Sequence, residues 1–160
     1  MVKLGVAGVG GRMGIMILKE IENRSDTVIA SGLVRSGSSL VGTDLGIIAS
    51  RECVGVAATD NPKQCFADAD VVIDFSLPEA IEEIAAAAIE AKKPWVVGTT
   101  GLDERQEAIL RTACHEVPVV FASNMSLGGN LLFALVEQVA GSLDDNYDIC
   151  LLYTSDAADE

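Results

Sequence analysis

The sequence predicts an α/β protein in which a parallel sheet carries helices on both faces. Apolar runs of strand length alternate along the chain with stretches at helical spacing, and this alternation favours a parallel sheet with right-handed crossovers. The first apolar run ends in the glycines Gly8, Gly10, Gly11 and Gly14, and a helical pattern follows directly. That pattern is set by Met13, Ile17, Leu18 and Ile21.

The expected elements follow from composition and local signals. Strands are expected where apolar and β-branched residues gather, at 3–7, 27–35, 54–58, 71–75, 95–98 and 119–122. Helices are expected at 12–22, from Pro62 onward, at 79–92, at 103–116 and within 128–141. Asp60 or Asn61 is expected to cap the helix that begins at Pro62, and Pro94 is expected to end the helix at 79–92. Residues 36–51 are rich in Gly and Ser and are expected to form a mobile loop.

The glycine turn has the character of a phosphate-binding turn in a Rossmann-type dinucleotide fold. Gly8 allows the tight turn, and Gly11 lets the backbone approach a pyrophosphate at the helix N-terminus. Gly14 lets the helix lie close to the strand. The alternative is a glycine-rich turn without a ligand, but its place between a strand and a helix at the start of the chain favours the nucleotide.

The residues after the second expected strand bear on the choice of cofactor. An acid about 20 residues past the glycines usually binds the ribose hydroxyls of NAD, whereas Val34 stands here and Arg35 follows it. Valine cannot accept those hydrogen bonds, and arginine pairs well with a 2′-phosphate. The pair favours NADP, although Arg35 could also simply solvate the end of a strand.

Polar loops follow three of the expected strands, at 74–76, 98–101 and 123–126. Ligands of open parallel sheets bind beyond the carboxyl ends of the strands, where these loops are expected to lie. The run Gly98-Thr99-Thr100-Gly101 would let a nicotinamide lie against the backbone, and an ordinary turn is an equally good interpretation. Asp74 could be catalytic, but a cap of the next turn is the favoured role. His115, the single histidine, is expected at a helix C-terminus, with no catalytic role.

Composition narrows the function classes. The 160 residues fit one domain, and a net charge of −13, from 11 basic and 24 acidic residues, argues against nucleic acid or an anionic membrane as partner. No run reaches membrane-spanning length and the N-terminus lacks a signal peptide, so a cytoplasmic protein is expected. The cysteines form no C-x-x-C pair, and the acids at 79–90 form a solvated helix face, so no metal site is expected.

Several motifs together resemble one family, the dihydrodipicolinate reductases of bacterial lysine and diaminopimelate synthesis. They are GVGGRMG at 8–14, GSSLVG at 37–42, VIDFSLPEA at 72–80, GTTG at 98–101 and SNMSLGGN at 123–130. The resemblance covers residues 1–149. It implies an NAD(P)H-binding domain at 1–126 and, at 127–149, the beginning of a truncated substrate and oligomerisation domain. That domain builds a homotetramer in full-length members, and no tetramer is expected of this chain alone.

The resemblance also implies which residues meet the cofactor. It implies that the pyrophosphate is held by Gly8, Val9, Gly10, Gly11, Arg12 and Met13. It implies that the nicotinamide is framed by Gly98, Thr99, Thr100, Ala122, Ser123, Asn124 and Met125. Arg35 would meet the 2′-phosphate. Many members have an acid where this chain has Val34, so NADPH is the expected cofactor, with NADH as the alternative.

The end of the chain departs from the family. Members continue into two adjacent histidines and a nearby lysine, credited with substrate binding and proton donation, and then into a Pro-Ser-Gly-Thr loop that holds a substrate carboxylate. These residues are absent, so no catalytic residue is expected in this chain. Residues 150–160 instead resemble a translated sequencing adapter, the alternative being a divergent native terminus.

The expected parent protein is an NADPH-dependent reductase of 4-hydroxy-tetrahydrodipicolinate, a small cyclic dicarboxylate. One alternative is another Rossmann oxidoreductase of amino-acid metabolism, such as a homoserine or diaminopimelate dehydrogenase. The motifs at 72–80 and 123–130 speak against it. The other alternative is a non-catalytic nucleotide-binding module, which a downstream sequence lacking the histidines and lysine would favour.

Overall fold

The computed structural model describes residues 1–144, 146 and 147, which fall into two units. The first unit runs from Met1 to Ser123, and the second begins at Asn124. The boundaries expected after residues 126 and 149 stay predictions. The adapter-like segment 150–160 lies outside the described residues.

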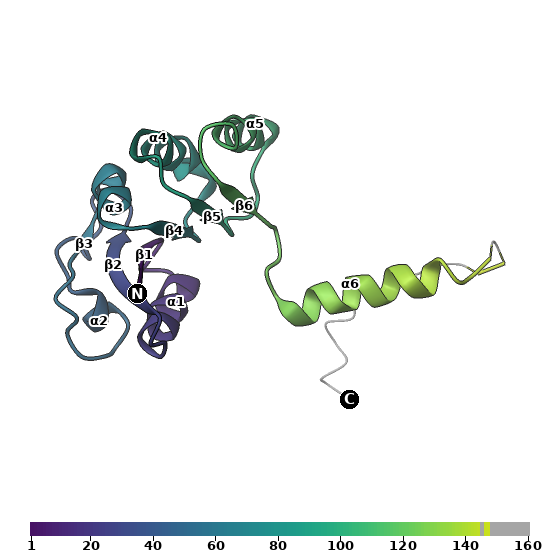
Figure 1. Ribbon diagram of the computed structural model, residues 1–160, viewed down its shortest axis with the longest axis horizontal. Helices are drawn as coiled ribbons and strands as arrows, with labels where there is room; N and C mark the ends of the chain where they lie inside the picture. Colours follow the sequence, from purple (N-terminus) through teal and green to yellow (C-terminus); the bar gives the residue numbers. More distant parts are fainter. Residues whose placement is uncertain (145, 148–160) are drawn as a thin grey trace. The chain divides into compact units, whose positions relative to one another are not determined.

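The apolar runs of the first unit form a single sheet (Figure 1). Its strands are β1 (Val2–Ala7), β2 (Thr27–Leu33), β3 (Ala58–Thr59), β4 (Val71–Asp74), β5 (Trp95–Val97) and β6 (Val119–Phe121). The strand order is β3-β2-β1-β4-β5-β6, and every neighbouring pair is parallel. This is the strand order of the dinucleotide-binding doubly wound fold, so the predicted Rossmann-type fold is confirmed.

Helices cover both faces of this sheet, as predicted. They are α1 (Arg12–Glu22), α2 (Leu45–Ile48), α3 (Pro62–Asp68), the 3₁₀ turn η1 (Pro78–Ala80), α4 (Ile81–Ala91) and α5 (Glu104–Ala113). Helices α3, α4 and α5 lie on one side of the sheet, and α1 and α2 on the other (Figure 1). Successive residues of a strand point to opposite faces. Val6 therefore joins the buried cluster beside α1 and α2, whereas Ala7 joins the cluster beside the other helices.

The loop expected at 36–51 is only partly a loop, because the one-turn helix α2 lies within it. Asp44 starts this helix by accepting a hydrogen bond from the Gly46 N–H at 2.9 Å. Four helical residues are too few to show an apolar period, so only the cap could have revealed the helix. Among the predicted helices, Asn61 rather than Asp60 caps α3, and its side chain accepts from the Lys63 N–H at 3.0 Å.

The strand expected at 54–58 is wrong, because only β3, at the end of this stretch, pairs with β2. The Asp44 carboxylate accounts for the difference. It accepts hydrogen bonds from the N–H groups of Val54 (3.0 Å) and Gly55 (2.7 Å). The backbone there is bonded to a side chain, and Gly55 adopts a positive φ of 77° that no strand contains.

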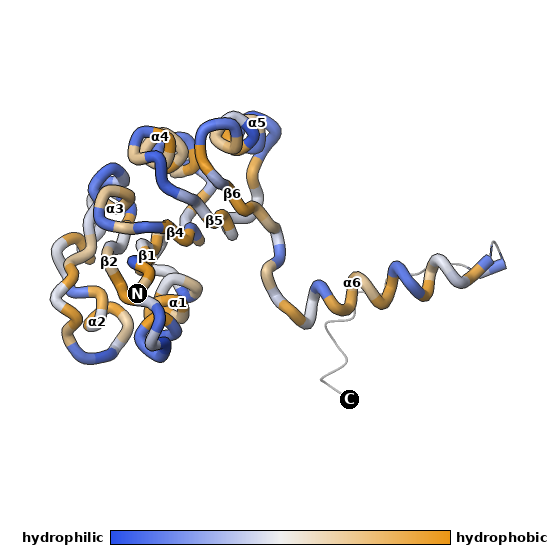
Figure 2. The backbone as a smooth tube through the Cα atoms, viewed as in Figure 1, coloured by the Kyte–Doolittle hydropathy of each residue, from blue (hydrophilic) through white to orange (hydrophobic). Residues whose placement is uncertain are grey.

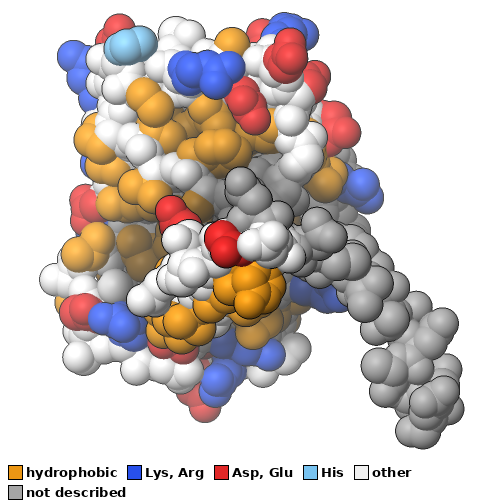
Figure 3. Space-filling model, turned by 90° about the vertical axis from the view of Figure 1, so that its right-hand side faces the viewer, with side chains coloured by type: hydrophobic (Ala, Val, Ile, Leu, Met, Phe, Trp, Pro, Cys, Tyr) orange, Lys and Arg blue, Asp and Glu red, His pale blue; other side chains and the backbone are white. Residues whose placement is uncertain are grey.

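The second unit contains helix α6 (Leu127–Ala140), which Ser126 caps by accepting from the Gly129 N–H at 3.2 Å. Hydrophobic and hydrophilic residues alternate along it (Figure 2), and none of its residues is buried. Large hydrophobic side chains are also exposed on β6, at Val120 and Phe121. Figure 3 shows hydrophobic side chains at the surface of the face that is turned toward the viewer. In the described part of the chain, no helix combines the length and the apolar character needed to cross a membrane.

Candidate cofactor site

The strand order of the sheet reverses at β1: β2 and β3 lie on one side of it, and β4, β5 and β6 lie on the other. The direct neighbours of β1 are β2 on one side and β4 on the other. Ala7 at the end of β1 pairs with Asp74 at the end of β4, and Asp74 pairs in turn with Val97 of β5. The loops that leave β1 and β4 therefore diverge from one place, which is where ligands bind in open parallel sheets.

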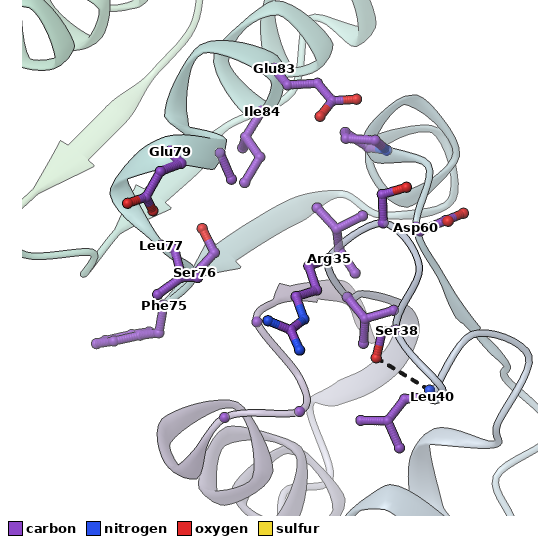
Figure 4. A pocket seen from close by; sticks show the side chains of 18 residues that line it. Arg35, Ser38, Leu40, Asp60, Phe75, Ser76, Leu77, Glu79, Glu83 and Ile84 are labelled. Carbon is purple, nitrogen blue, oxygen red and sulfur yellow. Dashed lines mark hydrogen bonds between the residues drawn. The ribbon is translucent and has the colours of Figure 1, made fainter.

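A cavity of about 590 Å³ lies at this place (Figure 4). Its volume is in the range of sites that enclose a small-molecule or cofactor ligand. The wall nearest the strand ends is formed by Gly8, Gly10, Gly11, Leu33, Val34, Arg35, Phe75 and Ser76. Ile84 of α4 and the acidic residues Asp60, Glu79 and Glu83 also line the cavity.

The glycines of the turn differ in how strongly the backbone requires them. Gly8 has a φ of 83°, which disfavours any side chain, and a methyl group on Gly14 would overlap the backbone of Gly8. Gly11 is unlike them. Its backbone is extended (φ −85°, ψ 164°), and an added Cβ would lie 3.3 Å from the Gly8 oxygen as its nearest neighbour. That contact is tight, so the turn would have to shift slightly to admit a methyl group, but the fold demands glycine less strongly at position 11 than at positions 8 and 14.

Helix α1 begins at the cavity without a side-chain cap. Gly11 is its N-cap residue, and its first turn contains no acid. Helices α2, α3, α5 and α6 are each capped by a side chain, from Asp44, Asn61, Asp103 and Ser126. Helix α4 also lacks such a cap, but it continues from the η1 turn and has acids in its first turn. The first N–H groups of a helix have no intrahelical partner and carry partial positive charge. The open start of α1 is thus suited to an anion such as a pyrophosphate.

Arg35 extends from the end of β2 into the cavity (Figure 4). It is exposed, and it belongs to none of the ion pairs formed by the described residues. Ser38 lies nearby, with its Oγ accepting from the Leu40 N–H at 3.2 Å. Val34 is 6% exposed and packs in the core beside α1. Arg35 is therefore the cation available for an anionic group at this end of the cavity.

Ser76 lines the cavity and lies beside Asp74. Its hydroxyl is buried and makes no hydrogen bond of good geometry among the described residues. It nevertheless lies close enough to the Asp74 carboxylate to oppose the rise in the pKa of that group. The sequence drew attention to the loop at 74–76 but not to Ser76 itself, because a local pattern does not show what surrounds a hydroxyl.

Asp74 ends β4 with a fully buried carboxylate. Its Oδ1 accepts from the Ser76 N–H at 2.8 Å, so the predicted cap of the next turn is confirmed. It also accepts from Thr99 Oγ1 and Trp95 Nε1, each at 3.2 Å, and these two partners could not be predicted from the sequence. Burial raises the pKa of Asp74 above its ordinary value, while the hydrogen bonds oppose that shift.

The structure places the other predicted cofactor residues outside the cavity lining. Val9 is buried in the core, whereas Arg12 and Met13 are exposed in the first turn of α1. Gly98 and Thr99 are buried behind Phe75 and Asp74, and Thr100 is exposed beside them. Ala122 and Ser123 follow β6, and Asn124 and Met125 begin the second unit. Their contacts with a cofactor stay predictions.

The arrangement fits a dinucleotide. A glycine-rich turn, an uncapped helix start, an unpaired arginine and the residue Ser76 meet at one cavity. These features supply hydrogen-bond donors and positive charge for phosphate groups. His115, by contrast, is exposed in the turn that follows α5.

Comparisons with known proteins show the family of this chain. Residues 2–125 match the family described as "Dihydrodipicolinate reductase, N-terminus". The chain is 40% identical over 149 residues to the 4-hydroxy-tetrahydrodipicolinate reductase of Hahella chejuensis, covering 93% of this chain and 56% of that protein. It is 39% identical over 147 residues to the reductase of the same name from Pseudoalteromonas atlantica, covering 92% and 55%. The chain thus spans about half the length of the curated relatives it matches.

A solved structure shares the fold. Dipicolinate-bound dihydrodipicolinate reductase from Paenisporosarcina sp. TG-14 superposes with a TM-score of 0.69, at 18% sequence identity. The superposition covers 88% of this chain and 54% of that protein. At this level of identity, the likeness concerns the fold.

Proposed function

The chain belongs to the dihydrodipicolinate reductase family, and from that premise we propose that its first unit binds NADPH for the reduction of 4-hydroxy-tetrahydrodipicolinate. The observation that carries the proposal is the cavity at the switch point of the sheet, which the glycine turn, Arg35 and Ser76 line together. A dinucleotide that crosses the switch point of the sheet would meet all three. Family membership supplies the substrate class, a small cyclic dicarboxylate.

The residues of the cavity divide the work of holding the cofactor. The backbone at Gly10 and Gly11 and the start of α1 would bind the pyrophosphate. Ser76, from the neighbouring loop, would donate its hydroxyl to the same ligand. Arg35 would pair with a 2′-phosphate, which NADPH carries and NADH lacks. Position 34 is a buried valine, so no carboxylate stands there to bind the ribose hydroxyls. This supports the preference for NADPH.

Reduced nicotinamide supplies a hydride when it is bound. The loop at 98–101 and the residues from Ala122 to Met125 would frame the nicotinamide and fix the face that it presents. Substrate binding and proton donation are proposed to lie in the remaining half of the relatives' length. The chain alone is therefore expected to bind cofactor without turnover.

Ser76→Ala tests the cofactor site by comparing stability with affinity. Removing the Ser76 hydroxyl should change the melting temperature of the free protein little, because it makes no hydrogen bond of good geometry there. NADPH binding should weaken about two- to twelvefold, the equivalent of about 0.5–1.5 kcal/mol for one hydrogen bond. The measurements are a thermal melt and a titration that follows nicotinamide fluorescence. A lower melting temperature with unchanged affinity would mean that Ser76 is structural.

A chimera tests the proposed reaction. Residues 1–149 are joined to the C-terminal part of the Hahella chejuensis relative, and NADPH oxidation is followed with the dicarboxylate substrate. Turnover by the chimera, with none by the 160-residue chain, is the expected result. A chimera that binds NADPH but shows no turnover would instead favour a nucleotide-binding module. Turnover by the chain itself would place catalytic groups among its own residues.

A further inference from the structure

Asp74 joins two loops at the carboxyl edge of the sheet. Its buried carboxylate accepts hydrogen bonds from Ser76 in the loop after β4 and from Thr99 in the loop after β5. A third bond comes from the indole of Trp95, within β5 itself. All three partners are donors, so a carboxylate, which accepts on both oxygens, satisfies them together.

A second contact ties the same two loops. Phe75 lies against Gly98 so closely that a methyl group on the glycine would overlap the phenyl ring. Phe75 also lines the cavity, as does Ser76. The loop after β4 therefore has one side in the cavity and the other side fastened to the loop after β5.

We propose that Asp74 is a positioning residue for the nicotinamide half of the cofactor. It fastens the loop that carries Ser76 to the loop at 98–101 before the cofactor arrives, so that both surfaces are set in advance. This inference rests on the proposed function, which places the nicotinamide beside the loop at 98–101.

The bond to Asp74 also defines the part played by Thr99. Its hydroxyl is donated to the Asp74 carboxylate, and the side chain is 2% exposed. Thr99 therefore offers the cofactor its backbone, while its side chain holds the loop in place. The neighbouring Thr100 is exposed, and its hydroxyl does not take part in the hydrogen bond to Asp74.

The test separates the two halves of the cofactor. NADPH and 2′,5′-ADP, which lacks the nicotinamide half, are titrated into the 160-residue chain and its variants. Asp74→Asn keeps the shape but turns an amide N–H₂ toward one of the donors. Thr99→Val removes one bond at nearly constant volume, and Thr99→Ser restores the hydroxyl. Both disruptive variants should weaken NADPH binding about tenfold and leave 2′,5′-ADP within about twofold. Thr99→Ser should bind both ligands as the wild type does.

A control variant and an NMR measurement distinguish a positioning role of Asp74 from a role in stability alone. Ser31→Ala is the matched control, because it removes another buried hydrogen bond, from Ser31 Oγ to the Cys65 carbonyl at 2.7 Å. It should lower the melting temperature without changing either affinity. Trp95 is the only tryptophan, so its indole N–H gives one resonance. That resonance should move in Asp74→Asn and should also move when NADPH binds to the wild type.

The possible results have separate meanings. Selective loss of NADPH affinity, with rescue by Thr99→Ser, supports the positioning role. Equal loss for both ligands, or no loss for either, overturns it and leaves the cofactor site standing. A wild-type chain that binds neither ligand overturns the proposed function, and the positioning role falls with it.

Discussion

The first unit and helix α6 differ in how they dispose of apolar side chains. In α1 of the first unit, Leu18 is 0% and Ile21 is 3% exposed. In α6, Leu131 is 58% and Val139 is 59% exposed, and no residue is buried. Both helices carry apolar residues at helical spacing, so the difference arises from what packs against them and not from their composition.

This difference separates two kinds of expectation. Every residue that lines the candidate cofactor cavity comes from the first unit, whose sheet and helices bury one another. Cofactor binding is therefore expected to be a property of that unit. Helix α6 carries an apolar surface that needs a partner, and its behaviour is expected to depend on what covers it.

A methyl group placed in each region gives the largest expected contrast. Gly11→Ala adds a methyl at the cavity, where the backbone is extended and the one near neighbour, the Gly8 oxygen at 3.3 Å, would have to shift slightly. The fold should persist, but NADPH binding should fall roughly a hundredfold because the methyl stands where the pyrophosphate approaches. The titration follows nicotinamide fluorescence, and circular dichroism checks the fold.

The matched change in the other region is Gly128→Ala in α6. A Cβ there would come no closer than 3.9 Å to its nearest neighbour, the Ser126 hydroxyl. This variant should bind NADPH like the wild type. If Gly11→Ala also bound NADPH like the wild type, the glycine turn would have no part in the site.

Arg35→Ala tests the specificity of the first unit. A charge-assisted hydrogen bond to a phosphate contributes about 1.5–3 kcal/mol, so the preference for NADPH over NADH should shrink about ten- to a hundredfold. Arg111→Ala on α5 is the control, because it removes the same charge from a residue outside the cavity lining. A ratio of the two affinities that survives in Arg35→Ala would exclude this arginine as the phosphate ligand.

Charges placed on α6 test the other side of the comparison. The exposed apolar residues of α6 should make the 160-residue chain self-associate, with a several-fold rise in apparent mass in sedimentation at high concentration. The double variant Leu132→Glu and Val136→Glu should be monomeric. Gln138→Glu adds a charge without removing apolar surface and should still associate. A wild-type chain that stays monomeric at every concentration would show that the α6 surface is covered.

Asp44 gives the smallest expected effect, on stability as a function of pH. The backbone N–H of Val54 is the main cause that lowers the pKa of Asp44 from 3.8 to about 2. A lowered pKa contributes stability above pH 3.8, and this contribution is lost as the pH falls through about 2. Asp44→Asn should melt slightly below the wild type at neutral pH, and the gap should close near pH 2. A gap that is constant with pH would mean that the charge of Asp44 is not responsible.

Those features of the fold that depend on local pattern could be predicted from the sequence. The glycine turn, the helix α1 and the buried strand β4 follow from residue spacing and apolar runs. The family's motifs then pointed to the cofactor. Helix α2 is too short to show an apolar period, so only its cap could have indicated it. The extent of β3 could not be predicted, because Asp44 accepts hydrogen bonds from the backbone of residues about ten positions away.

The parts of the site that the sequence could not reveal depend on contacts between loops. Nothing in the run Asp74-Phe75-Ser76 shows that the Ser76 hydroxyl is buried or that Trp95 reaches the Asp74 carboxylate. The family resemblance implied that Thr99 meets the cofactor, and its place in the sequence does not show that its hydroxyl is donated to Asp74. Such bonds join residues more than twenty positions apart, and a local pattern cannot contain them.

The most direct test of the central claim is a map of NADPH binding on the 160-residue chain. Backbone amide resonances are recorded with and without the cofactor. The largest changes should fall on Gly10, Gly11 and the start of α1, together with Arg35 and Ser76. Changes centred on α6 or on residues 44–55, or no changes at any NADPH concentration, would contradict a cofactor site at the switch point between β1 and β4.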